Sequence, residues 1–146
     1  MKEAILKEFP KVDCLIMAAA VSDWRPEKKF SEKLKIKKSW SLKLIPNPDI
    51  LKEVSRIKKD NQIVIGFALE TDDIKRNALK KLKEKKLDLI VANTPDFFGE
   101  GKFSRVIFLS KKGKVEEFDK IDKEKVAEKV IEWLENEILS NNNSYG

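Results

Sequence analysis

Residues 63–93 read IVIGFALETDDIKRNALKKLKEKKLDLIVAN, and this stretch decides the fold. Two short apolar runs, each bounded by polar residues, flank a lysine-rich segment from Thr71 to Lys86. Short runs that are apolar throughout are typical of strands in a buried parallel sheet. A crossover between parallel strands needs about a dozen residues or more, which this segment supplies. The stretch therefore predicts strand, helix and parallel strand, the unit of an α/β fold.

Ligands of open α/β sheets bind beyond the carboxyl ends of the strands, so a site is predicted near Phe67–Thr71. The 3.6-residue period of the following helix predicts a buried stripe of Ile74, Ala78, Leu79 and Leu82. Lys81 and Lys85 fall at the edge of this stripe, four residues apart, where their ammonium groups can reach over the sheet. Simple solvation explains these two lysines least well.

The composition limits the chemistry that the chain can perform. Its 146 residues suffice for one domain with one core. Lys and Arg outnumber Asp and Glu by 31 to 25, and the net charge of +6 indicates either anionic ligands or solvated helix faces. The absence of histidine excludes a Ser-His or Cys-His nucleophile, an imidazole base and a His-ligated zinc site. Catalysis would depend on positioning and electrostatics, and we assign no catalytic residue or metal ligand.

The single cysteine, Cys14, lies in an apolar run, so a disulfide or a cysteine-built zinc site within the chain is excluded. No apolar run approaches the roughly 20 residues of a membrane span, and no signal-peptide pattern begins the chain. These features predict a protein of the reducing cytoplasm that does not interact with membranes.

A strand and a loop precede the central unit. Val12–Ala20 (VDCLIMAAA) predicts a buried strand, and small residues at its end leave room for a ligand or another backbone. Val21–Glu32 follows the carboxyl end of this strand and has no apolar period, so it is predicted to be a loop. Asp23 in this loop is either a site residue or the cap of an ordinary turn.

From Lys33 to Ile45 apolar residues alternate with lysines and serines, which predicts a β-hairpin arm that turns near Lys38 and Ser39. One face of the arm is apolar and consists of Leu34, Ile36, Trp40, Leu42 and Leu44. This face must be covered, either by its own domain or by a second subunit. Dimerisation is therefore a reasonable expectation.

Asn47, Pro48 and Asp49 predict a helix start, with Asn47 as the cap, Pro48 at the first helical position and Asp49 in the first turn. The free N–H groups of such a start suit a phosphate or a ligand carbonyl, although most helix starts bind only water. The predicted buried stripe of this helix consists of Ile50, Leu51, Val54 and Ile57.

The chain after Asn93 is predicted to begin with a loop in which Phe97 or Phe98 covers a site or the core. Arg105–Ser110 and Val115–Phe118 predict antiparallel strands at the sheet edge. A final helix, capped by Asp122, carries an apolar stripe of Val126, Ala127, Val130, Ile131, Leu134 and Ile138.

The predicted fold is a three-layer α/β sandwich with a parallel central sheet, an antiparallel edge and a hairpin arm. Residues 1–139 form the domain, and residues 140–146 are expected to be a disordered polar tail.

Five motifs occur in order along the chain, with matching spacings, and each would be weak alone. Together they resemble the phosphopantothenoylcysteine synthetase family, the second activity of the bifunctional coenzyme A biosynthesis flavoprotein. The likeness runs from about Val12 to Ile131. The motifs are AAAVSDWRP (18–26), EKLKIKKS (32–39), NPDIL (47–51), GFALET (66–71) and KKLKEKKLDLIVAN (80–93).

The resemblance implies a Rossmann-like fold, a homodimer and a ligase that joins 4'-phosphopantothenate to cysteine. This family uses CTP or ATP with Mg²⁺ and forms an acyl-nucleotide intermediate. In this interpretation Phe67, Lys81 and Lys85 form one wall of the nucleotide site, opposite Asp23, Lys33 and the helix start. The implied nucleotide-binding residues are Asp23, Lys33, Pro48, Asp49, Ile50, Leu51, Phe67, Lys81 and Lys85.

The family pattern also contains a glycine-rich first strand and turn, a segment with an Arg and an Asn tied to the intermediate, and a preceding flavin-dependent decarboxylase domain. All of these would precede Met1. We therefore expect a truncated or split synthetase that lacks the amino-terminal part of its domain. That missing segment or the decarboxylase domain would be its partner.

Two alternatives remain open from the sequence. One is a non-catalytic Rossmann-like module whose basic face binds nucleic acid or a protein partner. Nucleic acid is disfavoured, because aromatic residues do not interleave the basic runs. The other is a dimerisation fragment without affinity for a ligand.

Overall fold

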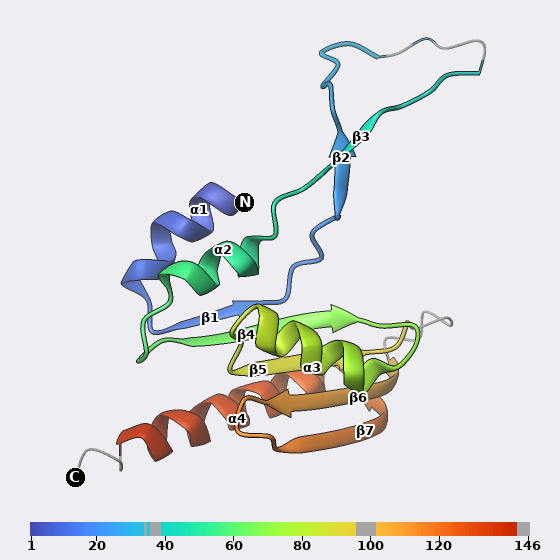
Figure 1. The fold of residues 1–146 in the computed structure, drawn as a ribbon. Helices are drawn as coiled ribbons and strands as arrows, with labels where there is room; N and C mark the ends of the chain where they lie inside the picture. Colours follow the sequence, from blue (N-terminus) through green and yellow to red (C-terminus); the bar gives the residue numbers. More distant parts are fainter. Residues whose placement is uncertain (34, 36–38, 96–101, 143–146) are drawn as a thin grey trace.

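The computed structural model describes residues 1–33, 35, 39–95 and 102–142. Its main sheet has the strand order β1-β4-β5-β6-β7 (Figure 1). The parallel strands are β1 (Cys14–Met17), β4 (Ile63–Leu69) and β5 (Leu89–Asn93). The antiparallel edge consists of β6 (Lys102–Ser110) and β7 (Val115–Asp122). The predicted parallel centre with an antiparallel edge is confirmed.

Helices cover both faces of this sheet, which confirms the three-layer prediction (Figure 1). One face carries α1 (Lys2–Glu8), a short 3₁₀ helix (Phe9–Lys11), α2 (Ile50–Ile57) and α3 (Ile74–Glu84). The buried apolar residues of the last three share one core cluster, and α1 packs against it with partly buried residues. The other face carries α4 (Lys123–Asn142), which packs in a second cluster. No helix within the described ranges is both long and apolar enough to cross a membrane.

The central unit of β4, α3 and β5 has the predicted order and direction. Gly66 in β4 permits close packing on the α2 and α3 face of the sheet. A Cβ atom at this position would lie 2.7 Å from Leu87 Cδ1 and 3.4 Å from Leu51 Cδ1. Because both leucines are buried, the missing side chain allows α2 and the loop before β5 to pack directly on the strand.

β1 is shorter than the predicted strand Val12–Ala20, and it is an edge strand of the sheet. Its exposed Ile16 and the exposed alanines that follow contradict the expectation of a fully buried segment. An edge strand is paired on one side only, so its apolar residues are less covered than those of β4. At the carboxyl end, α4 extends through Asn142, and Ser140 Oγ donates to the carbonyl of Glu137 at 2.9 Å. The prediction of a disordered tail from residue 140 is therefore wrong for residues 140–142, and residues 143–146 lie outside the described part of the chain.

The predicted helical stripes are broader than the observed ones. In α2 and α3 the predicted core residues Ile57 and Leu79 are exposed, whereas the other members of both stripes are buried. In α4, Val126 and Val130 are buried, but Ala127, Ile131 and Ile138 are exposed. Helical periodicity gives the direction of a stripe, whereas its breadth depends on how much of the helix contacts the sheet.

The arm exists, but its strands differ from the prediction. β2 (Trp24–Pro26) pairs antiparallel with β3 (Leu44–Pro46), so the predicted loop Val21–Glu32 supplies one strand. Phe30 and Trp40, which lie in the segment that connects β2 to β3, contact each other edge to face with ring centroids 6.0 Å apart. The predicted turn at Lys38, together with Leu34 and Ile36, lies outside the described residues. An alternating pattern without a core face leaves strand register weakly specified.

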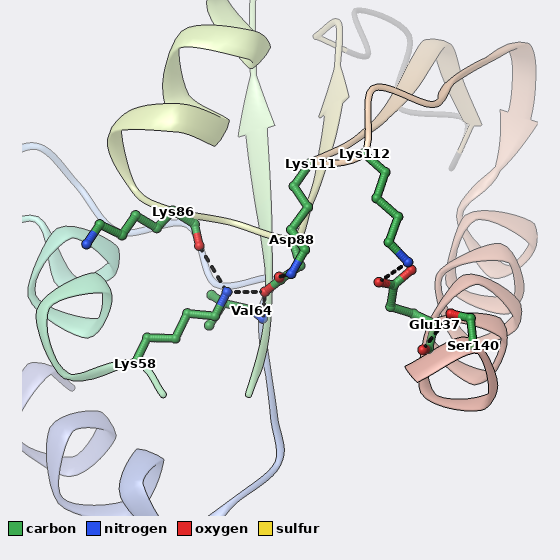
Figure 2. Close-up of polar contacts among 8 residues, drawn as sticks. All are labelled: Lys58, Val64, Lys86, Asp88, Lys111, Lys112, Glu137 and Ser140. Atoms are coloured by element: carbon green, nitrogen blue, oxygen red, sulfur yellow. Dashed lines mark hydrogen bonds and ion pairs between the residues drawn. The ribbon is translucent and has the colours of Figure 1, made fainter. Parts of the chain in front are cut away.

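A buried carboxylate connects several elements at the amino ends of the parallel strands (Figure 2). Asp88 is fully buried, and its Oδ2 accepts a hydrogen bond from the backbone N–H of Val64 at 2.7 Å and another from Lys58 Nζ. Its Oδ1 accepts from Lys111 Nζ. The backbone of Asp88 also bonds to Val64 and Lys111, each at 2.9 Å. This network joins α2, β4, β5 and the turn after β6.

We expect Asp88→Ala to lower the free energy of unfolding by about 3–5 kcal/mol, because it leaves two lysines and a buried N–H group without their carboxylate. Urea denaturation monitored by circular dichroism measures this loss. Asp60→Ala, at an exposed turn residue, is the control and should change stability by less than about 0.5 kcal/mol. A loss below about 1 kcal/mol for Asp88→Ala would contradict the structural role of the network.

Cys14 in β1 is expected to react slowly with alkylating reagents. Burial raises the pKa of its thiol from 9.0 to about 11, and the carboxylates of Asp88 and Asp13 add to the increase. At pH 8 the thiolate fraction should therefore be roughly 100-fold below that of an ordinary cysteine. Iodoacetamide labelling followed by mass spectrometry should show slow modification in buffer and fast modification in urea, and fast labelling of the folded chain would refute this.

Candidate functional site

The carboxyl ends of the parallel strands carry a group of polar and charged residues. Glu70 follows β4 and Asn93 ends β5, and the backbone N–H of Glu70 donates to the carbonyl of Asn93 at 2.9 Å. β4 and β5 are parallel, so their carboxyl ends meet at this edge of the sheet. Open α/β sheets bind ligands at that edge. α2 leads into β4, so its first turn points toward the same edge (Figure 1).

The first turn of α2 is capped by Asp49, and the prediction that Asn47 caps it is wrong. Asp49 Oδ1 accepts a hydrogen bond from the N–H of Lys52 at 3.2 Å. The side chain of Asn47 is used elsewhere, because it donates to the carbonyl of Ser22 at 2.7 Å and accepts from Arg25 Nη1 at 2.9 Å. The side chain of Asn47 therefore stabilises the base of the arm, and Asp49 is the N-cap of α2.

Both lysines singled out on α3 reach carboxylates at this edge. Lys85 Nζ lies 3.0 Å from Asp49 Oδ2, and Lys81 Nζ lies 2.7 Å from Glu70 Oε1. The side chain of Glu70 is 9% exposed, whereas that of Lys81 is 41% exposed and can reach solvent. The two ammonium groups thus come from one ridge of α3, and their charges are balanced by carboxylates from two other elements.

Two buried oxygen atoms at this edge have no hydrogen-bond partner of good geometry among the described residues. They are Glu70 Oε1, which is close to the Lys81 ammonium but poorly aligned with it, and Thr94 Oγ1. Buried polar groups are normally hydrogen-bonded, so such atoms indicate a functional position or a bound water. The edge therefore retains hydrogen-bonding capacity next to the two lysines.

Several predicted residues surround the start of α2. Asp23 is exposed, and its backbone carbonyl accepts from the N–H of Asn47 at 2.7 Å, which places it beside the residues that lead into Pro48 and Asp49. The side chains of Ile50 and Leu51 are buried in the core. These two residues can contribute only backbone N–H groups to a ligand at this helix terminus.

Two predicted positions do not join this group through their side chains. Phe67 packs with the core cluster on the α4 face, opposite the face that carries Lys81 and Lys85. The ring of Phe67 therefore does not face the two lysines, and Phe67 can take part in the predicted wall only through its backbone at the strand end. Lys33 lies in the connection between β2 and β3, which projects from the body of the molecule (Figure 1).

Sequence reasoning missed Thr94 as a site residue, and it did not single out Glu70 within the predicted site range Phe67–Thr71. Both immediately follow a strand, Glu70 after β4 and Thr94 after β5, and that position was the available signal. Alternation along β4 puts Glu70 on the same face as Ala68, which belongs to the α3 core cluster. Phe97 and Phe98, which were expected to cover a site or the core, lie outside the described residues.

The carboxylates of this edge do not form a magnesium site of their own. Mg²⁺ prefers octahedral oxygen ligands and is commonly held by one or two carboxylates together with substrate phosphates. Within the described part of the chain, no three His, Cys, Asp or Glu residues are arranged to hold a metal ion. Asp49 and Glu70 are each paired with a lysine. A protein-built cation cage therefore does not fit these residues.

The chain is similar to parts of several longer curated proteins. A protein named cysteine/cysteine sulfinic acid decarboxylase, from an unknown prokaryotic organism, is 38% identical over 135 residues, which cover 90% of this chain and 38% of that protein. The coenzyme A biosynthesis bifunctional protein CoaBC of Borreliella burgdorferi is 39% identical over 136 residues, which cover 91% and 34%. The chain thus spans a little over a third of the length of these curated relatives.

A crystal structure of the C-terminal domain of the coenzyme A biosynthesis bifunctional protein CoaBC has the same fold. It superposes with a TM-score of 0.75 at 32% sequence identity, and the match covers 95% of this chain and 61% of that chain. The model of the DNA/pantothenate metabolism flavoprotein C-terminal domain family matches residues 1–138. The chain therefore belongs to the family of the DNA/pantothenate metabolism flavoprotein C-terminal domain.

Proposed function

We propose that this chain is part of a ligase that joins 4'-phosphopantothenate to cysteine in coenzyme A biosynthesis. In this proposal its strand edge binds the nucleotide, CTP or ATP with Mg²⁺, and the reaction passes through an acyl-nucleotide intermediate. Family membership and the similarity to CoaBC proteins support the assignment. The observation that carries it is that residues of three motifs pair at one ligand-binding edge. Lys85 pairs with Asp49 of the NPDIL motif, and Lys81 pairs with Glu70 of the GFALET motif.

The charges of this edge suit a ligand that carries phosphates. Lys81 and Lys85 have compensating carboxylates in Glu70 and Asp49, so both ammonium groups are held over the edge rather than free in solvent. A phosphate would compete with these carboxylates for the ammonium groups, and charge-assisted hydrogen bonds of this kind are the strong ones. The start of α2 adds backbone N–H donors beside them. With no histidine in the chain, such electrostatic stabilisation is the contribution these residues can make.

Magnesium would enter this site with the nucleotide. Because the described carboxylates form no cation cage, phosphate oxygens and water would supply most of its ligands. The chemistry that Mg²⁺ supplies when bound is neutralisation of phosphate charge. The residues of the chain would hold the nucleotide at its phosphates and fix its orientation at the strand edge.

The Lys81→Ala, Lys85→Ala double variant is expected to lose nucleotide binding. Each ammonium-to-phosphate hydrogen bond contributes about 1.5–3 kcal/mol, so two losses weaken binding at least about 100-fold. Isothermal titration of the chain with CTP and with ATP, each with Mg²⁺, measures the affinities. The matched control is Arg76→Ala with Lys80→Ala, which removes the same charge from exposed positions of the same helix.

Equal losses in the double variant and the control would refute the site. If the folded chain binds neither nucleotide but binds oligonucleotides with a steep salt dependence, the basic-face alternative would replace the ligase proposal. The synthesis of phosphopantothenoylcysteine can be assayed with the chain alone and with the product of the upstream gene added, which is the candidate for the missing amino-terminal segment.

We propose the flavin-dependent decarboxylase domain of the bifunctional relatives as a further partner.

We also propose that the chain forms a homodimer through its arm. The strands of the arm and the segment that joins them expose apolar side chains, and these are Trp24, Phe30, Trp40, Leu42 and Leu44. Arg25, Lys28 and Lys29 line a groove of about 550 Å³ beside Phe30 and Trp40. A second copy of the chain that packs on this surface would remove the exposed aromatic rings from water.

Sedimentation velocity at several concentrations is expected to show a dimer for the natural chain and a monomer for Trp40→Glu with Leu42→Glu. Charges in an apolar contact lose hydration without gaining a partner, so the association should fail. The control is Ile138→Glu with Leu139→Glu, which changes exposed apolar residues of α4. Dimers that persist in the arm variant, or that dissociate only in the control, would place the interface elsewhere.

A further inference from the structure

A second groove lies at the end of the strands opposite the candidate nucleotide site. Its volume is about 590 Å³, and it is bounded by α3, by the loop before β5 and by the turn between β6 and β7. The network of Asp88 lies beside it, at the amino ends of β4 and β5 (Figure 2).

The rim of this groove is basic. Its charged members are Lys58, Lys83, Lys86 and Lys111, and the carboxylate beside them is Asp88. Four ammonium groups against one carboxylate leave a local charge of +3. Among the described residues, Lys83 and Lys86 have no ion-pair partner, and both are exposed. The other lysines of α3, Lys75, Lys80 and Lys81, each pair with a carboxylate.

Two of these lysines are held in place by the buried carboxylate. An ammonium group has three N–H donors. Lys58 gives one to Asp88 and one to the carbonyl of Lys86 at 3.2 Å, and Lys111 gives one to Asp88. Within the described structure Lys111 therefore keeps two donors for another acceptor, and its side chain is 49% exposed. Asp88 thus holds a partly exposed cation at the end of the groove.

The carboxyl-terminal turn of α3 lies at this end of the sheet, and its backbone carbonyl groups are engaged in hydrogen bonds. The last turn of α3 is closed by backbone hydrogen bonds from Lys85, Lys86 and Leu87 to carbonyls of the preceding turn, at 2.9–3.2 Å. These bonds satisfy carbonyl groups of the last turn. The end of the helix still carries roughly half a negative charge, which the local charge of +3 outweighs.

The floor of the groove is apolar and partly exposed. It consists of Leu79, Leu82, Leu87, Leu109 and Val115. Leu79 is 41% and Val115 is 43% exposed, so a ligand that covers them gains from removing apolar surface from water. None of the described residues that line the groove is aromatic, so it offers no platform on which a base could stack. This separates it from a second nucleotide or nucleic-acid site.

We propose that this groove binds a small amphipathic anion, with a phosphate or carboxylate at one end and an unbranched apolar chain at the other. The anionic group meets Lys111, Lys83 and Lys86, and the chain lies on Leu79 and Val115. A bare anion would leave the floor exposed, and an uncharged apolar molecule would leave the ammonium groups without a partner. The volume is within the range of small-molecule sites. The groove shares no residue with the Lys81 and Lys85 edge, so this inference does not depend on the proposed ligase function.

The test titrates the full chain with octyl phosphate, octanoate, inorganic phosphate and octanol, followed by isothermal calorimetry and by NMR shifts of groove residues. Octyl phosphate or octanoate should bind at least about tenfold more tightly than inorganic phosphate and octanol, because each of the latter offers only half of the interaction. The comparison of the two octyl anions identifies the preferred head group. Equal affinities for octyl phosphate, inorganic phosphate and octanol would overturn the proposal.

Matched variants locate the binding. Lys83→Gln with Lys86→Gln should weaken octyl phosphate binding about tenfold, and Leu79→Ser should weaken it without affecting inorganic phosphate. The control is Lys120→Gln with Lys125→Gln, which removes the same charge outside the groove and, like Lys86, includes a lysine with positive φ. If Lys86→Gln impairs folding, Lys83→Gln alone is compared with Lys125→Gln. Equal losses in groove and control variants would overturn the proposal, as would weaker CTP binding that accompanies the loss of octyl phosphate binding.

Discussion

The buried carboxylate of Asp88 is the interaction on which the arrangement of this domain depends. A carboxylate without water must be compensated fully, since one unpaired buried charge costs several kcal/mol. Here the compensation comes from a backbone N–H of β4, the ammonium of Lys58 after α2 and that of Lys111 after β6. These three donors are far apart in the sequence, so satisfying one side chain fixes the amino edge of the sheet, the end of a helix and the turn of the antiparallel edge.

This anchoring explains how the opposite edge acquires its geometry. α2 and α3 both end at the anchored side, where Lys58 is bonded to Asp88 and to the carbonyl of Lys86. Because the helices are rigid, their position at that side determines where the residues farther along them lie. The cap residue Asp49 then comes within 3.0 Å of Lys85, and Lys81 comes within 2.7 Å of Glu70. Gly66 contributes by letting Leu51 and Leu87 approach the strand beneath these helices.

The sequence was sufficient for the features that depend on local pattern. The β4, α3 and β5 unit follows from its apolar runs, and the positions of Lys81 and Lys85 follow from the helical period.

Features that depend on tertiary contacts could not be predicted in this way. A strand buried on both faces has no polar alternation, so nothing indicated that Phe67 faces α4. The arm has no core face to fix its register. The role of Asp88 was not visible in the local pattern, because the partners of its side chain lie 23 to 30 positions away in the sequence. Asn47 has the right residue type for a cap, but tertiary hydrogen bonds from Arg25 and to Ser22 occupy its side chain.

The hydrogen bonds at the base of the arm have a mechanical consequence. Arg25 donates to the carbonyl of Pro46 and to Asn47, while Asn47 is bonded to Ser22 and Asp23, so both strands of the arm are clamped at one point. That point lies two residues before Asp49, the residue that caps α2 and pairs with Lys85. A displacement of the arm that moved its base would therefore act first on the first turn of α2 and on the Asp49–Lys85 pair, because only Pro48 separates Asn47 from Asp49.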